Sequence, residues 1–100
     1  MTDAEAQRAM ATKVVDWLDG RIPTDRFVSE YWRIRRELLN TNWSAFEGVF
    51  GEVMSSVDTA VDSYRIDDRA DFEIDEQQLR QELLTAMENL RRRAPSVLNG

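Results

Sequence analysis

The sequence predicts an all-α fold, an antiparallel four-helix bundle. Apolar residues recur at helical spacing in four segments, and each segment has its own start and stop signals. The chain has 100 residues with only four glycines and two prolines, and few runs of β-branched residues, which disfavours an all-β fold. Connections of about four to twelve residues between amphipathic helices predict antiparallel neighbours. We expect one domain over residues 1–94 and a C-terminal tail over residues 95–100.

The first helix is expected from Asp3 to Asp19. Thr2 and Glu5 have the S/T-x-x-E spacing of a capping box, which satisfies free backbone N–H groups at a helix start. Gly20 supplies the left-handed stop. The apolar face contains Met10, Val14, Trp17 and Leu18.

The second helix is expected from Thr24 to Leu39. Pro23 precedes it, Thr24 is the expected N-cap, and Asn40 closes it. Its apolar stripe contains Phe27, Tyr31, Ile34 and Leu38, and its other face carries Arg26, Arg33, Arg35 and Arg36.

The third helix is expected from Ser44 to Ser63, with Ser44 and Glu47 as a second capping box. Gly48 and Gly51 lie inside it, and each costs about 1 kcal/mol relative to alanine. We therefore expect a neighbouring helix to approach closely at these glycines. The apolar stripe contains Phe46, Val49, Val53, Val57, Ala60 and Tyr64.

The fourth helix is expected from Glu76 to Arg93. Asp75 is its N-cap, Gln78 completes a capping box, and Ile74 packs on Leu79 as a hydrophobic staple. Three arginines in the last turn suit the negative end of the helix dipole. The apolar stripe contains Leu79, Leu83, Met87 and Leu90.

The amino-acid composition disfavours several classes of function. The chain has neither cysteine nor histidine, which excludes disulfides and thiolate metal sites and removes the usual general base near neutral pH. We expect no enzyme, no cofactor and no metal site. No apolar run is long enough to span a bilayer and no signal peptide is evident, so we expect a cytoplasmic protein. A net charge of -6 disfavours nucleic acid and membranes and favours a basic protein partner.

The charge is uneven along the chain. Residues 21–36 hold five arginines and two acids, a balance of +3, whereas residues 47–76 hold ten acids and two arginines, a balance of -8. The densest stretch is YRIDDRADFEIDE, residues 64–76, with six carboxylates. Like charges this close repel one another and lower the stability of the fold, so their concentration in one stretch requires an explanation.

The acidic stretch has four candidate explanations. Capping and loop chemistry account for Asp75 and Glu76. Asp58 and Asp62 fall near the C-terminal end of the third helix, where the dipole disfavours anions, so stability alone would not select them. A calcium loop starting at Asp67 fails because an arginine, a phenylalanine and a glutamine replace two acids and the turn glycine. Acid–base catalysis by Glu73 and Asp75 lacks a dry pocket.

The fourth explanation is a recognition surface. A compact patch of carboxylates imitates a row of phosphates and suits a basic groove. Phe72 and Ile74, apolar among the acids, are candidate anchors for such a contact. Of the three tryptophans, Trp17 and Trp32 are expected in the core. For Trp43 two roles remain open, capping the end of the bundle or joining an interface.

Two stretches resemble the colicin D immunity protein family, over about Val14 to Arg92. They are WLDGRIPTDRFVSEYWRIRREL and DDRADFEIDEQQLRQELL, of which Phe72 to Asp75 is the most similar part. The resemblance implies an acidic four-helix bundle that occupies the tRNA-binding cleft of a ribonuclease toxin and imitates substrate phosphates. By position it implies a binding role for Asp62, Asp67, Asp68, Glu73 and Asp75. Arg65 stands where the family has an acid, and the loop is one residue shorter.

The expected function is therefore that of an immunity protein in a 1:1 complex with a basic ribonuclease toxin domain. The alternative is a non-enzymatic helical adaptor or regulator that binds another basic protein. The expected partner-binding residues are Asp62, Asp67, Asp68, Asp71, Phe72, Glu73, Asp75 and Glu76.

Overall fold

The computed structural model describes residues 1–64 and 74–99, and these are mainly helical. The elements are α1 (Asp3–Leu18), α2 (Thr24–Thr41), the short 3-10 helix η1 (Trp43–Phe46), α3 (Gly48–Ser63), α4 (Glu76–Arg93) and α5 (Ser96–Asn99). Within the described ranges the only β contact is an isolated bridge between Tyr64 and Ile74. The predicted all-α class is confirmed.

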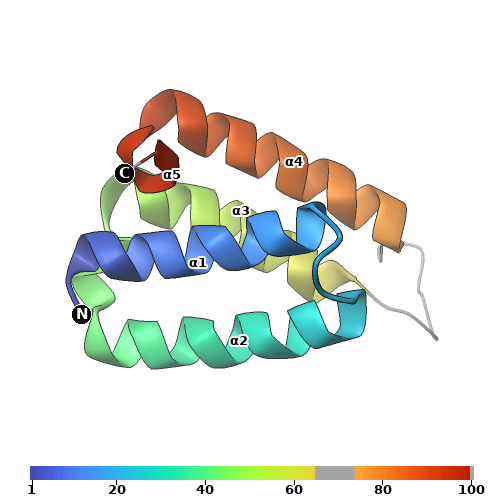
Figure 1. Ribbon diagram of the computed structural model, residues 1–100, viewed down its shortest axis with the longest axis horizontal. Helices are drawn as coiled ribbons and strands as arrows, with labels where there is room; N and C mark the ends of the chain where they lie inside the picture. The colour runs from blue at the N-terminus through green and yellow to red at the C-terminus, as the bar shows by residue number, and fades with distance from the viewer. Residues whose placement is uncertain (65–73, 100) are drawn as a thin grey trace.

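The long helices run back and forth along one direction (Figure 1). As a result, the end of α1, the start of α2, the end of α3 and the start of α4 lie at one end of the molecule. Both chain termini lie toward the other end. The segment expected to carry the acidic patch is therefore attached at the end that also holds the α1–α2 turn.

The start of α1 confirms the predicted capping box. The Glu5 backbone N–H donates to Thr2 Oγ1 at 3.1 Å, and the Thr2 N–H donates to Glu5 Oε1 at 2.9 Å. The predicted stop is also confirmed, because Gly20 has a φ of 79° and its N–H bonds the carbonyl of Trp17 at 3.0 Å.

The predicted N-cap of α2 is wrong by one residue. Pro23 takes the N-cap position, and its carbonyl accepts from the N–H of Phe27 at 2.9 Å. Thr24 lies inside the helix, and its hydroxyl faces other helices. The helix also continues past the expected stop at Asn40, to Thr41.

The predicted start of α3 is wrong as well. Ser44 belongs to η1, and its hydroxyl donates to Asp3 Oδ2 at 2.6 Å rather than capping a helix. Glu47 is the N-cap of α3, and Gly48 follows with a φ of 68°. The close neighbour of Gly51 is the short helix η1 and not one of the long helices. A Cβ at Gly51 would lie 1.9 Å from the carbonyl oxygen of Phe46, the last residue of η1, whereas nothing lies within 4 Å of a Cβ at Gly48.

The start of α4 confirms Asp75 as N-cap, with the Gln78 N–H donating to Asp75 Oδ1 at 2.8 Å. The segment after α4, expected as a tail, instead forms α5, and Val97 packs into the core. No helix in the described ranges combines the length and the apolar character needed to cross a lipid bilayer.

Aromatic side chains fill the core between α1 and α2. Trp17 and Phe27 stack with ring centroids 5.0 Å apart, and Tyr31 follows Phe27 at 5.9 Å. Trp17 is buried as predicted, Trp32 is half-buried at the edge of the core, and Trp43 is 62% exposed. Trp43 therefore does not serve as a buried cap.

Candidate partner-binding site

The structure places three of the eight predicted binding residues: Asp62, Asp75 and Glu76. The other five lie outside the described residues: Asp67, Asp68, Asp71, Phe72 and Glu73.

The two ends of the α3–α4 connection are held together. The N–H of Ile74 donates to the carbonyl of Ser63 at 3.0 Å, and Tyr64 and Ile74 pair as a parallel bridge. Both side chains are buried at 9% exposure, so each end of the connection is anchored in the core. Asp62 in the last turn of α3 and Asp75 at the start of α4 therefore lie on either side of this anchor.

Asp62 is exposed and makes no hydrogen bond or ion pair with a described residue. It lies in the last turn of α3, which contains no basic residue. A carboxylate there faces the negative end of the helix dipole, which is unfavourable. Asp62 therefore has no stabilising role in the described structure and is free to contact a partner.

Asp75 and Glu76 both contribute to the fold. Asp75 caps α4, as described above. Glu76 Oε1 accepts from Thr24 Oγ1 at 2.7 Å, and Thr24 Oγ1 accepts from the indole Nε1 of Trp17 at 3.1 Å. This chain of hydrogen bonds joins α1, α2 and α4 at the end of the molecule where the acidic stretch is attached. Both residues are also exposed.

The inference that stability would not select Asp58 is wrong. Its carboxylate accepts from Arg35 Nε at 3.1 Å and from Arg35 Nη2 at 2.9 Å, and the Tyr31 hydroxyl also donates to it. Burial, together with the hydrogen bond to Asp58, raises the pKa of the Tyr31 phenol. The cost of an anion near the end of α3 is offset by these contacts from α2.

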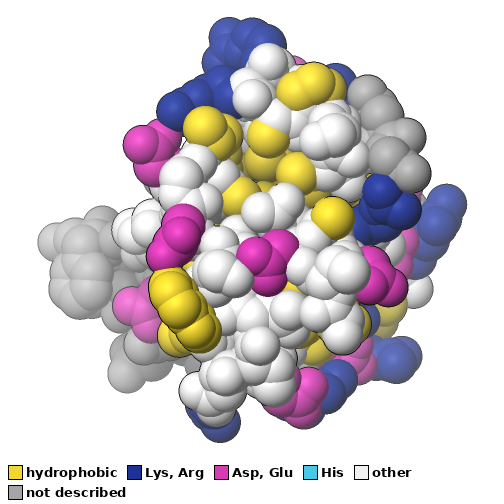
Figure 2. Space-filling model, turned by 90° about the vertical axis from the view of Figure 1, so that its left-hand side faces the viewer, with side chains coloured by type: hydrophobic (Ala, Val, Ile, Leu, Met, Phe, Trp, Pro, Cys, Tyr) yellow, Lys and Arg dark blue, Asp and Glu magenta, His cyan; other side chains and the backbone are white. Residues whose placement is uncertain are grey.

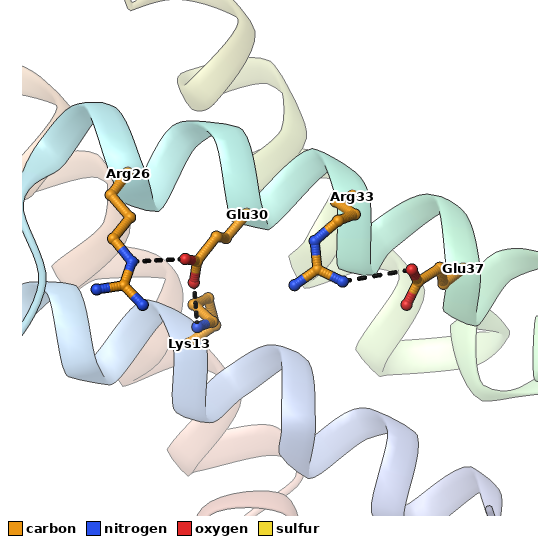
Figure 3. Close-up of polar contacts among 5 residues, drawn as sticks. All are labelled: Lys13, Arg26, Glu30, Arg33 and Glu37. Atoms are coloured by element: carbon orange, nitrogen blue, oxygen red, sulfur yellow. Dashed lines mark hydrogen bonds and ion pairs between the residues drawn. The ribbon is translucent and has the colours of Figure 1, made fainter.

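Two of the four arginines of α2, Arg26 and Arg33, pair with acids of the same helix. Glu30 accepts from Lys13 Nζ of α1 at 2.7 Å and from Arg26 Nε at 2.6 Å, and Arg33 pairs with Glu37 at 3.3 Å (Figure 3). The hydrogen bonds from Lys13 and Arg26 lower the pKa of Glu30 to about 2. These basic residues are therefore engaged by acids of α2 itself rather than by the acidic segment.

A groove between α3 and α4 was missed by the sequence reasoning. It has a volume of about 280 Å³ and lies beside the turn that carries Asp62. The lining residues are Ser56, Thr59, Ala60, Ser63, Ile74 and Glu82. The signal available in the sequence was the polar spacing of Ser56, Thr59 and Ser63 on α3, but Glu82 joins them only through packing.

Figure 2 views the molecule from the opposite end, toward which both chain termini lie. Figure 2 shows hydrophobic side chains in the upper part of that face, with acidic and basic side chains both spread around them.

Within the described ranges, no three acidic side chains lie close enough to hold a metal ion.

No family model matches the sequence, and neither the curated proteins nor the solved structures contain a match.

Proposed function

We propose that this protein is an immunity protein of the colicin D type, which binds and inhibits a basic ribonuclease toxin domain. The observation that carries the proposal is Asp62, an exposed carboxylate that has no partner in the described structure and opposes the α3 dipole. It begins a stretch that continues through the carboxylates of residues 67–76. Acids that do not stabilise the free protein are understandable if a basic partner neutralises them.

The proposed scaffold is an antiparallel four-helix bundle formed by α1 to α4, with η1 and α5 as additions. In that scaffold the connection between α3 and α4 is anchored at Tyr64 and Ile74, so the acidic segment is presented from a fixed base. Asp62 and Asp75 flank this anchor, and charges held in a fixed geometry bind better because less conformational entropy is lost on association.

The proposed mechanism is electrostatic. The carboxylates occupy the basic RNA-binding cleft of the toxin and exclude the substrate phosphates. Opposite charges accelerate the encounter, and the rate falls as salt screens them. We expect a 1:1 complex whose affinity decreases strongly between about 50 and 500 mM salt, a range over which the Debye length falls about three-fold.

The test is binding to the C-terminal domain of the toxin encoded beside this gene, together with a tRNA-cleavage assay. Wild-type protein should bind tightly and stop cleavage. Reversing the charges of Asp67, Asp68 and Glu73 to lysine should abolish binding and leave the fold intact, and Asp62→Lys should weaken binding on its own. Glu88→Lys, an exposed site further along α4, changes the net charge by the same amount as Asp62→Lys and is its matched control.

Two results would overturn the proposal. One is wild-type protein that neither binds nor inhibits the toxin domain. The other is affinity that does not change with salt, which would exclude imitation of substrate phosphates.

A helical adaptor is the second candidate, favoured by two exposed apolar side chains near the α2–η1 junction. Leu39 is 46% exposed and Trp43 is 62% exposed. Exposed aromatic side chains are typical anchors of protein interfaces. Under this alternative, Trp43→Ser abolishes partner binding and the charge reversals have little effect. Under the immunity proposal, the charge reversals abolish binding and Trp43→Ser has little effect.

A further inference from the structure

The groove between α3 and α4 has one acidic wall and one hydroxyl-rich wall. Ser56, Thr59 and Ser63 line it from the second half of α3, and Glu82 lines it from α4. Ile74, nine-tenths buried beneath it, provides an apolar surface together with Ala60. Its volume of about 280 Å³ leaves room for one long side chain.

No basic side chain of a described residue lines the groove. Glu82 is exposed and forms no hydrogen bond or ion pair with any described residue. The last turn of α3 contains no basic residue, so the negative end of its dipole is also uncompensated. Asp62 lies in the same turn and adds to the negative potential.

The hydroxyl wall is able to accept hydrogen bonds. Thr59 Oγ1 donates its proton to the carbonyl of Ser55 at 3.0 Å, so its oxygen lone pairs remain available as acceptors. The Ser56 and Ser63 hydroxyls rotate to suit a donor. A cation in the groove would thus meet one carboxylate, several neutral acceptors and an apolar surface.

We propose that this groove binds an arginine side chain of a partner protein. Arginine presents five N–H donors in a planar fork, which suits a carboxylate on one side and hydroxyl oxygens on the other. Its aliphatic stem packs on apolar surface such as Ile74 and Ala60. Lysine fits less well because its three donors radiate from one point. The identity of the partner as a basic toxin domain rests on the proposed function, whereas the chemistry of the groove does not.

The first test needs no toxin. N-acetyl-argininamide is titrated into 15N-labelled protein at millimolar concentration, and backbone amide shifts are followed. We expect saturable shifts at Thr59, Ser63 and Glu82, loss of saturation in Glu82→Gln, and no such loss in Glu88→Gln. N-acetyl-lysinamide should bind more weakly. Shifts that spread equally over all exposed carboxylates, or that persist in Glu82→Gln, would overturn the proposal.

The second test uses the toxin domain encoded beside the gene. Glu82→Gln should raise Kd on the order of ten-fold, as expected for loss of one charge-assisted contact, and Glu88→Gln should leave it unchanged. If wild-type protein fails to bind the toxin but retains the argininamide site, the proposed function fails and the groove assignment stands. If wild-type protein binds the toxin and Glu82→Gln binds equally well, the groove assignment fails and the proposed function stands.

Discussion

Arg35 of α2 and Asp58 of α3 form a two-pronged ion pair, with Nε–Oδ1 at 3.1 Å and Nη2–Oδ2 at 2.9 Å. The guanidinium also lies over the ring of Phe46, 4.3 Å from its centroid. One arginine therefore links α2, α3 and η1. Both charged side chains are largely covered, with 17% of Arg35 and 24% of Asp58 exposed.

Asp58→Asn should lower the free energy of unfolding by about 2 kcal/mol, because it leaves the covered Arg35 guanidinium without its counter-ion. The value is below that of a fully buried pair because both side chains retain some exposure. Urea unfolding of the variant measures it. The matched control is Asp62→Asn on the same helix, which should cost nothing. Equal stability of the two variants would show that the Arg35 pair contributes no net stability.

Asp58 illustrates a kind of interaction that local sequence patterns do not predict. Local patterns identified the Thr2–Glu5 capping box and Asp75 as N-cap, because the groups that satisfy these helix starts are a few residues away. The partner of Asp58 is 23 residues away in sequence, so no local pattern reveals it.

The prediction that α3 starts at Ser44 is wrong for the same reason. Ser44 has a capping pattern, but its hydroxyl is engaged by Asp3, which is 41 residues away. At the candidate site, the sequence identified the exposed carboxylate Asp62 through its unfavourable place on the helix dipole. It did not identify Glu82, because the groove exists only where α3 and α4 pack together.

Glu30 should make stability depend on pH in the acidic range. Its pKa is lowered from 4.5 to about 2 in the folded protein by hydrogen bonds from Lys13 and Arg26 (Figure 3). A carboxylate with a lowered folded-state pKa stabilises fully above its unfolded pKa. That contribution is lost as the pH falls through the folded value.

We therefore expect part of the stability to disappear between about pH 4.5 and pH 2, and Glu30→Gln to flatten that part of the profile. Carbon-13 NMR of the Glu30 carboxyl group measures the pKa directly. Glu37→Gln is the control, since the Glu37 ion pair is highly exposed. A Glu30 carboxyl that titrates near 4.5 would contradict the prediction.

Gly51→Ala should destabilise the protein, although alanine is the better helix former. Propensity alone predicts a gain of about 1 kcal/mol. The added Cβ, however, would lie 1.9 Å from the Phe46 carbonyl oxygen, and that oxygen belongs to backbone that must shift. We expect a net loss of about 2 kcal/mol in thermal or urea unfolding.

Gly48→Ala is the matched control for this clash. Its φ of 68° is strained for alanine, but no atom lies within 4 Å of the new Cβ, so a loss of about 1 kcal/mol is expected. A Gly51→Ala protein more stable than wild type would mean that η1 relaxes without cost.

Thr24→Val should cost about 1–2 kcal/mol, because the buried indole N–H of Trp17 loses its acceptor and Glu76 loses a donor. Urea unfolding measures the loss. Thr85→Val, at an exposed position of α4, is the control and should be nearly neutral. A neutral Thr24→Val would indicate that water replaces the hydroxyl at this end of the molecule.

Asp62 and Asp75 provide the sharpest contrast between a carboxylate that serves the fold and one that does not. Asp75→Ala removes the N-cap of α4 and should cost about 1 kcal/mol. Asp62→Ala removes an anion from the negative end of the α3 dipole and should raise stability by about 0.5 kcal/mol. Both values come from urea unfolding in low salt, and the gain from Asp62→Ala should shrink as salt screens the dipole. The same Asp62→Ala protein should bind the toxin domain less tightly, so stability and affinity move in opposite directions. An Asp62→Ala protein that is less stable than wild type would give this carboxylate a role in the fold, and the main support for the immunity proposal would be lost.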